Sequence, residues 1–148
     1  MVKLPPPIWA LIYVLVTLAI SWQLGWPELP GLPLPKLGIG LAIIPWVLPV
    51  WAFLTFRRAG TEINPISPTN HALVVDGPYR YTRNPMYLGL VLVTFGIAIW
   101  VGAWPMLLAP IAVFATANWV HIPFEEAKMR RQFGAAFDQY LAQVRRWI

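Results

Sequence analysis

Hydrophobic residues occupy long uninterrupted blocks of the chain, not the alternating or helical spacing of a half-buried surface. Residues 8–26 and 37–56 form two such blocks, and neither contains a charged side chain. A helix rises about 1.5 Å per residue, so it needs about 20 apolar residues to cross a bilayer. Each block is therefore predicted to form a membrane-spanning helix, with kinks at Pro45 and Pro49 in the second.

A third apolar block, residues 86–121, contains no Lys, Arg, Asp or Glu. Residues 102–105 interrupt it with a glycine placed to end one helix and a proline placed to start the next. We expect a tight hairpin of two short spanning helices, residues 86–101 and 105–121, with a kink at Pro110. The predicted fold is therefore an all-α integral membrane protein with four transmembrane helices.

Two polar segments follow these blocks, a link of residues 57–84 and a tail of residues 123–148. In the link, a β-favouring triplet precedes Asp76-Gly77, which predicts a tight turn against the membrane surface and no sheet. In the tail, helical spacing of apolar residues predicts a C-terminal amphipathic cytoplasmic helix on the bilayer surface, with a bend at Gly134. These apolar positions are Met129, Phe133, Phe137, Tyr140, Leu141 and Val144.

The composition supports membrane insertion, because 58% of the residues are hydrophobic and 11% are charged. Soluble domains carry about 25% charged residues. The length of 148 residues fits one membrane-embedded domain over residues 1–148. The absence of cysteine excludes disulfides, thiolate metal ligands and cysteine nucleophiles, and no metal site is expected.

The positive charges predict the orientation of the chain in the inner cell membrane. If both termini are cytoplasmic, all but one of the 11 Lys and Arg residues lie inside, and the exception is Lys36. This asymmetry accounts for the net charge of +5, so no nucleic-acid partner is expected. A signal peptide is an alternative for the first block, but the apolar run continues past the candidate cleavage site at residues 19–21. The residues placed inside are Lys3, Arg57, Arg58, Arg80, Arg83, Lys128, Arg130, Arg131, Arg145 and Arg146.

Polar residues gather at the start of the third block, where the sequence reads RYTRNPMYLG. The hairpin brings Arg83, Asn84 and Tyr87 of this stretch toward Glu125 and Glu126, which follow the fourth helix. Carboxylates and cations that face each other at a membrane boundary can bind a zwitterion. The acidic pair is equally well explained by placement at a helix N-terminus, and arginines at membrane edges commonly snorkel.

A wider set of residues resembles the integral-membrane methyltransferases, which include isoprenylcysteine carboxyl methyltransferases and phospholipid N-methyltransferases. The set comprises residues 77–89, the apolar hairpin, Glu125-Glu126, Phe133-Gly134 and Tyr140, over roughly the last half of the chain. The resemblance implies a membrane enzyme that uses S-adenosylmethionine. In that family an Arg-(His/Asn)-Pro-x-Tyr motif and a Glu-Glu pair build the cofactor site, which corresponds here to Arg83, Asn84, Pro85, Tyr87, Glu125 and Glu126.

Two positions depart from the isoprenylcysteine enzymes. Asn84 stands where those enzymes usually have His, and Ala135-Ala136 stands where they have an acidic pair after Phe-Gly. Both departures weaken the expectation of a prenylcysteine substrate.

We expect S-adenosylmethionine-dependent methyl transfer to a lipid or another lipophilic acceptor that enters from the bilayer. A methyl sulfonium donor carries positive and negative groups and an aromatic base, so its site needs carboxylates, cationic or amide donors, and an aromatic wall. Catalysis can then rest on positioning in a site closed to water. The candidates for cofactor binding are Asn84, Pro85, Tyr87, Glu125, Glu126, Tyr79 and His121, and those for catalysis or acceptor orientation are Arg83, Glu126 and Arg130, with Asn118 as a weaker candidate.

Two alternatives remain open at this point. Membrane reductases related to the steroid reductases share a similar hairpin plan and use NADPH, although Gly38-Ile39-Gly40 lacks the third glycine of a dinucleotide fingerprint. The other alternative is a non-enzymatic four-helix membrane protein, either a scaffold or a transporter subunit. For this the spanning segments should show buried charge or paired repeats, and they show neither. No obligate protein partner is inferred, because small-residue spacing such as Gly38 to Ala42 is too common to indicate a dimer.

Overall fold

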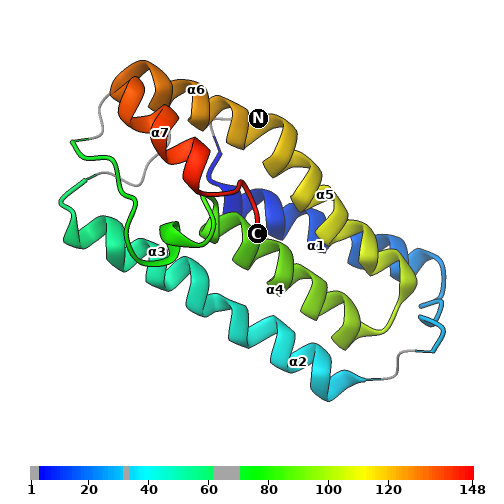
Figure 1. The fold of residues 1–148 in the computed structure, drawn as a ribbon. Helices are drawn as coiled ribbons and strands as arrows, with labels where there is room; N and C mark the ends of the chain where they lie inside the picture. Colours follow the sequence, from blue (N-terminus) through cyan, green and yellow to red (C-terminus); the bar gives the residue numbers. More distant parts are fainter. Residues whose placement is uncertain (1–3, 32–33, 62–70) are drawn as a thin grey trace.

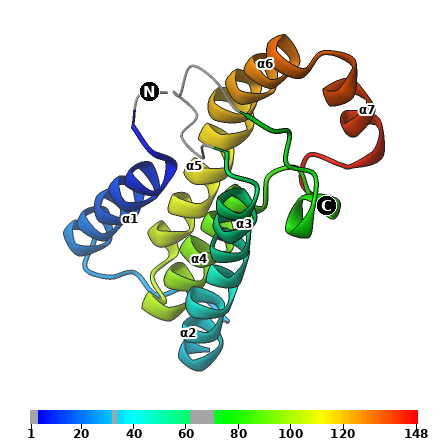
Figure 2. The same cartoon turned by 90° about the vertical axis from the view of Figure 1, so that its left-hand side faces the viewer.

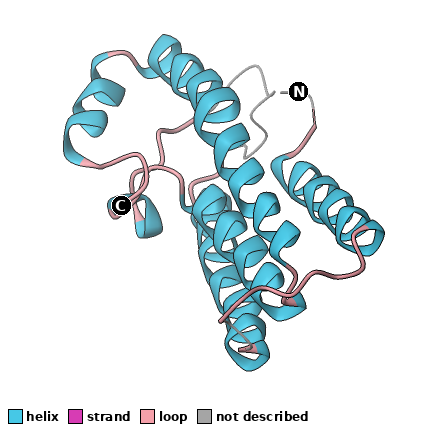
Figure 3. Cartoon of the chain, turned by 90° about the vertical axis from the view of Figure 1, so that its right-hand side faces the viewer, coloured by secondary structure: helices cyan, strands magenta, loops and turns pink. Residues whose placement is uncertain are grey.

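The computed structural model describes residues 4–31, 34–61 and 71–148, and in these ranges it consists of helices joined by loops, with no strand (Figures 1 and 3). This confirms the all-α prediction. The α-helices are α1 (Pro6–Gln23), α2 (Pro35–Ile43), α3 (Val47–Arg58), α4 (Pro85–Val101), α5 (Leu108–Thr116), α6 (Ile122–Phe133) and α7 (Ala135–Gln143). Short 3₁₀ turns lie at Ile44–Trp46, Gly77–Arg80 and Trp104–Leu107, and a π-helical turn lies at Ala117–His121.

The helices run up and down around α4, which packs against α2 and α3 on one side and α5 on the other (Figure 2). Helix α1 packs along α5. At one end the α1–α2 loop meets the α4–α5 turn, where Leu29 N donates to Gly102 O over 2.7 Å and Trp104 N donates to Pro27 O over 3.1 Å. The other end carries α6, α7 and the 3₁₀ turn Gly77–Arg80, and this end positions the candidate site.

Three helical stretches are long and apolar enough to cross a membrane, judged by length and composition. They are Pro6–Gln23, Pro35–Arg58 and Trp104–Phe133, with 18, 24 and 30 residues. Helix α4 is a shorter apolar helix of 17 residues. Large apolar side chains cover the outside of these helices, so three to four of them suit an apolar solvent.

The proline kinks follow the prediction most clearly at Pro45. This residue lies in the 3₁₀ turn that separates α2 from α3. Pro49 and Pro110 lie in the first turns of α3 and α5, so each helical segment restarts just before its proline. A proline in a first turn displaces no hydrogen bond within its own segment.

The predicted hairpin is confirmed, but the fourth helix continues beyond its predicted end at residue 121. Gly102 adopts φ 72°, a left-handed conformation that ends α4, and Pro105 lies in the turn that starts the return helix. The return helix then runs without a break from Trp104 to Phe133. Pro123 offers no N–H to a helical ladder, and the wider π turn immediately before it accommodates this loss. The acidic pair therefore lies inside a helix, and a helix N-terminus does not explain it.

The tail differs from the predicted single surface helix. Gly134 adopts φ 50° and separates α6 from α7, so the predicted bend is a complete break. The apolar residues of both helices pack with Ala52, Val74 and Tyr79 in one core cluster. Their spacing therefore reports contact with α3 and the link, and not a face turned to lipid.

The link forms the predicted turn without a sheet in its described part. Gly77 adopts φ 60° and opens the 3₁₀ turn directly after Asp76. Residues 62–70 of the link, and Lys3 in the cationic set, lie outside the described residues. The other cationic residues of the predicted inner set lie on α3, the link, α6 and the segment after α7, whereas Lys36 lies at the start of α2 at the opposite end (Figure 1).

Two glycines set the close approach of α2 to α4. A Cβ atom at Gly96 would meet the backbone of Leu41 and Ala42 and would lie 2.7 Å from the carbonyl oxygen of Leu41. A Cβ atom at Gly38 would lie 2.6 Å from Cα of Trp100. The small-residue stripe that contains Gly38 is thus used within the chain, because the absence of side chains lets the two backbones touch.

We predict that Gly96→Ala destabilises the protein by about 1–3 kcal/mol or more, because α2 must move away from α4 to admit the methyl group. The matched control is Gly40→Ala, whose new Cβ would meet its nearest neighbour, Cδ1 of Ile44, at an ordinary 3.9 Å. Thermal unfolding in detergent, followed by circular dichroism, measures both variants. Equal unfolding temperatures for the two would contradict the proposed backbone contact.

Candidate functional site

Two segments far apart in the sequence meet at the end of the bundle that carries α6 and α7. The residues just before and at the start of α4 contact the acidic pair of α6. Arg83 Nη2 lies 3.0 Å from Glu126 Oε1, and the Tyr87 hydroxyl donates to Glu125 Oε1 over 2.6 Å. These contacts join the two halves of the motif that the sequence singles out.

A cavity of about 580 Å³ lies beside these contacts. Its wall is formed by residues 4–7 at the start of α1, by α3 and the link, and by α4, α6 and α7. This volume lies within the range of ligand sites in proteins, about 300–1,000 Å³. Its wall is mostly apolar and aromatic, and the charged side chains in it are Arg83, Glu125 and Lys128. Of the predicted site residues, Tyr79, Arg83, Asn84, Pro85, Tyr87 and Glu125 line the cavity, whereas His121, Glu126 and Arg130 do not.

Glu125 and Glu126 point in different directions because they are consecutive residues of one helix. Successive side chains on a helix point about 100° apart. Glu125 therefore turns to the cavity and Tyr87, while Glu126 turns to the arginines on the other side. The two carboxylates occupy different surroundings and cannot have the same role.

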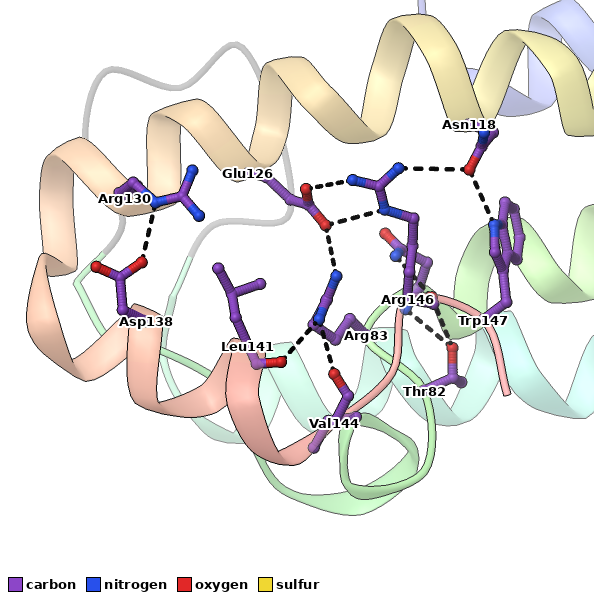
Figure 4. A network of polar contacts seen from close by, with 11 residues as sticks. Thr82, Arg83, Asn118, Glu126, Arg130, Asp138, Leu141, Val144, Arg146 and Trp147 are labelled. Carbon is purple, nitrogen blue, oxygen red and sulfur yellow. Dashed lines mark hydrogen bonds and ion pairs between the residues drawn. The ribbon is translucent and has the colours of Figure 1, made fainter.

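The Glu126 carboxylate lies between two guanidinium groups (Figure 4). Arg146 Nη2 donates to Oε2 over 2.7 Å and its Nε donates to Oε1 over 3.3 Å, while Arg83 Nη2 donates to Oε1 over 3.0 Å. The side chains of Arg83 and Glu126 are only 14% and 16% exposed. Both carboxylate oxygens are therefore used within the protein.

Arg83 also caps the C-terminal end of α7. Its Nη1 donates to the carbonyl oxygens of Leu141 over 3.2 Å and Val144 over 2.7 Å, which are the terminal acceptors of that helix. A cation at a helix C-terminus satisfies otherwise unpaired carbonyls and opposes the negative end of the dipole. Arg83 thus links α7 to α6 while its side chain borders the cavity.

Two tyrosines form the aromatic wall near Glu125. The hydroxyl of Tyr140 donates to the backbone carbonyl of Tyr79 over 2.8 Å. Burial, and next the negative charge of Glu125, raises the pKa of Tyr79 above its ordinary value. Burial raises the pKa of Tyr140 as well, although the charge of Arg83 opposes this shift. Both phenols therefore remain neutral at physiological pH.

Arg130, a predicted catalytic candidate, lies away from the cavity. Its Nε contacts Asp138 Oδ1 at 2.9 Å, and both side chains are more than half exposed, at 54% and 56%. Figure 4 shows this pair apart from the Glu126 network. An exposed pair of this kind contributes little to stability, about 0–1 kcal/mol.

His121 lies behind Tyr87, in a separate small pocket. The two rings stack with centroids 6.0 Å apart. This pocket has a volume of about 10 Å³ and includes Trp9 and Tyr13 of α1 in its wall. The His121 side chain is buried, and its Nε2 has no hydrogen-bond partner in the described part of the chain.

Arg146 and Trp147 also contact the candidate site, although neither was predicted to do so. Arg146 was expected only as one of the cytoplasmic cations, but its side chain binds Glu126 and contacts Asn118 Oδ1 at 3.5 Å. Trp147 Nε1 donates to the same Asn118 oxygen over 3.1 Å. These partners lie 20 to 29 residues away in the chain, so no helical or strand spacing could have revealed them.

The similarity of this chain to known proteins covers the region that carries the candidate site. Residues 35–136 match the family described as phospholipid methyltransferase. Protein-S-isoprenylcysteine O-methyltransferase B of Arabidopsis thaliana is 31% identical over 127 residues, which cover 78% of this chain and 61% of that protein. Protein-S-isoprenylcysteine O-methyltransferase A of the same plant is 30% identical over 115 residues, covering 72% of this chain and 55% of that protein. A probable protein-S-isoprenylcysteine O-methyltransferase of Oryza sativa subsp. indica is 31% identical over 115 residues, covering 72% and 56%.

The chain thus spans between about half and two thirds of the length of these relatives. The family match covers most of the described helices, from the start of α2 to the start of α7. It includes the complete motif from Arg83 to Tyr87 and both glutamates of α6. The chain belongs to the phospholipid methyltransferase family.

Proposed function

We propose that the protein transfers a methyl group from S-adenosylmethionine to a lipophilic acceptor. The observation that carries this proposal is the cavity of about 580 Å³ at the junction of the family motif and Glu125. Family membership and the methyltransferase names of the relatives support the same activity.

The donor set of the cavity fits S-adenosylmethionine. When bound, this cofactor supplies a methyl group on a positively charged sulfur. Glu125 places a carboxylate in the cavity for a positive group of the donor, and the Tyr87 hydroxyl holds that carboxylate in place. Phe56, Tyr79 and Tyr140 supply an aromatic wall for the adenine ring or the sulfonium.

The division of the acidic pair separates two roles. We assign cofactor binding to Glu125, Asn84 and Tyr87 together with Tyr79 and Pro85, all of which line the cavity. Glu126 acts through Arg83 and Arg146 and positions the chain around the cavity. Arg83 borders the cavity and remains our candidate for orienting a polar group of the acceptor, whereas Arg130 does not line the cavity and pairs with Asp138.

The acceptor enters through an apolar mouth of the cavity. Leu4, Trp46 and Phe53 line the cavity and are also exposed on the outside, at 42%, 46% and 47%. In a bilayer such a surface faces lipid, so an apolar acceptor can reach the cavity without crossing water. His121 lies on the α1 side of Tyr87, outside the cavity, and borders it only through the stacked ring of Tyr87.

We propose four spans, with both termini cytoplasmic and the cavity at the cytoplasmic edge of the inner membrane. Exposed tryptophans at the α4–α5 end suit an aromatic belt at the opposite interface, and the cationic residues gather at the cavity end. The segment formed by α6 and α7 would then lie at the cytoplasmic surface. The tryptophans of this belt are Trp22, Trp26, Trp100 and Trp104.

The two alternatives from the sequence gain no support. The family and the relatives carry methyltransferase names, which favour neither an NADPH-dependent reductase nor a non-enzymatic scaffold. Close packing on Trp100 accounts for Gly38, so the Gly38-Ile39-Gly40 run does not require a nucleotide.

We predict that Glu125→Gln weakens binding of S-adenosylhomocysteine by tenfold or more, because the cavity loses its carboxylate while its shape is kept. Tyr87→Phe, which removes only the hydroxyl that holds Glu125, is expected to have a smaller effect in the same direction. Isothermal titration calorimetry on protein in lipid nanodiscs measures both.

Arg130→Ala serves as the control and should bind like the wild type, since Arg130 lies outside the cavity wall. Absence of binding by the intact protein, or displacement of S-adenosylhomocysteine by NADPH, would contradict the proposed cofactor. Unaltered binding after combined Glu125→Ala and Glu126→Ala substitution would contradict the proposed site.

We also predict that the protein transfers labelled methyl groups from S-adenosylmethionine into an apolar component of a membrane lipid extract. Phe53→Asn should slow this transfer without changing S-adenosylhomocysteine affinity, because it makes the apolar mouth polar and leaves Glu125 in place. Phe95→Asn makes the same change on α4 outside the cavity and should leave the transfer rate unchanged. Mass spectrometry of the labelled product identifies the acceptor, and a labelled product found only in the aqueous phase would count against a bilayer route.

A further inference from the structure

We propose that the segment Val144–Trp147 is a built-in part of the cofactor site and that Arg146 is its positioning residue. The inference rests on the proposed function, because it assigns this segment to the same cavity. None of its residues belongs to the motif that identifies the family, and the family match ends before it, at residue 136.

The backbone of this segment lies directly against the motif. Arg83 N donates to the carbonyl oxygen of Arg145 over 3.0 Å. The carbonyl oxygen of Arg146 accepts two further hydrogen bonds, from the Thr82 hydroxyl over 3.2 Å and from the Asn84 amide Nδ2 over 2.9 Å. Three successive motif residues are thus fixed by two successive carbonyls.

The hydrogen bond to Asn84 determines how that side chain presents itself. An amide has a donating nitrogen on one side and an accepting oxygen on the other. Because Nδ2 is turned to the Arg146 carbonyl, the oxygen is the group that Asn84 can offer to a donor in the cavity it lines. The segment therefore fixes the orientation of the Asn84 amide, whose oxygen can accept a hydrogen bond from an amino or hydroxyl group of the cofactor.

The side chain of Arg146 holds the segment in this place. Its guanidinium donates to both oxygens of Glu126, from Nη2 to Oε2 over 2.7 Å and from Nε to Oε1 over 3.3 Å (Figure 4). Glu126 Oε1 also accepts a hydrogen bond from Arg83. Arg146 therefore contacts the motif twice, through its own carbonyl and through Glu126. A planar guanidinium suits this two-pronged contact, which a lysine ammonium reproduces only in charge.

Trp147 anchors the other side of the segment. Its indole nitrogen donates to Asn118, and its ring lies 4.9 Å from that of Phe114, centroid to centroid. It also packs against the cluster of Tyr87, Ala117 and Ile122. Since Tyr87 carries the hydroxyl that holds Glu125, the segment supports both polar sides of the cavity.

The test is the affinity of the purified full chain in nanodiscs for S-adenosylhomocysteine, measured by calorimetry together with the unfolding temperature. Arg146→Ala should weaken binding about tenfold, the effect of losing one charge-assisted contact. Arg146→Lys should recover part of this loss, because it restores the positive charge next to Glu126 but not the paired N–H donors of the guanidinium. Arg131→Ala removes the same charge from an exposed position on α6 and should bind like the wild type.

Two further variants separate positioning from general destabilisation. Gly96→Ala lowers stability at the far side of the bundle and should leave the affinity unchanged, so reduced stability alone does not produce the Arg146 effect. Combining Arg146→Ala with Glu126→Gln should weaken binding no more than the larger of the two single effects, because both act through one contact. Wild-type affinity in Arg146→Ala, or fully additive effects in the double variant, would overturn this inference alone. Absence of binding by the wild type would overturn the proposed function.

Discussion

The organisation of the site depends on one buried carboxylate held by two arginines. Glu126 of α6 binds Arg83, which precedes α4, and Arg146, which follows α7. These three segments lie far apart in the sequence, so the contacts of Glu126 hold them in position relative to one another. Removing one partner leaves the remaining charge of a partly buried ion pair without compensation. The three residues together therefore hold the cavity wall on this side.

The π turn in the return helix makes this contact possible. It carries the helix past Pro123, so that α6 extends from the bundle toward α7 and does not start anew at the membrane edge. Glu125 and Glu126 then point to different sides of a rigid helix. Glu125 can thus supply a carboxylate to the cavity, while Glu126 holds the surrounding segments through Arg83 and Arg146.

The features that could be predicted from the sequence are those determined by residues close together in the chain. Long charge-free blocks predicted the apolar helices, Gly102 and Pro105 predicted the hairpin, and Gly134 predicted a bend in the tail, which in the structure is a complete break. Arg83, Asn84, Tyr87 and Glu125 were found because a motif and a hairpin place them together. The roles of Arg146 and Trp147, and the inward packing of α7, depend on contacts over 20 or more residues, and no periodic pattern encodes those. Arg130 was indistinguishable in sequence from a site residue because its partner, Asp138, lies across the Gly134 break.

The geometry also changes what the departures from the isoprenylcysteine enzymes mean. The side chain of Asn84 donates an N–H to the carbonyl of Arg146, and a histidine ring nitrogen can donate to the same acceptor. Ala135 and Ala136 lie exposed at the start of α7 and do not line the cavity. Asn84 lines the cavity but makes a hydrogen bond that a histidine could also make, and the two alanines lie outside the cavity, so neither departure argues for or against a prenylcysteine. Leu4, Trp46 and Phe53 line the cavity and are exposed on its apolar side, so under the proposed function these are the residues that an apolar acceptor meets first.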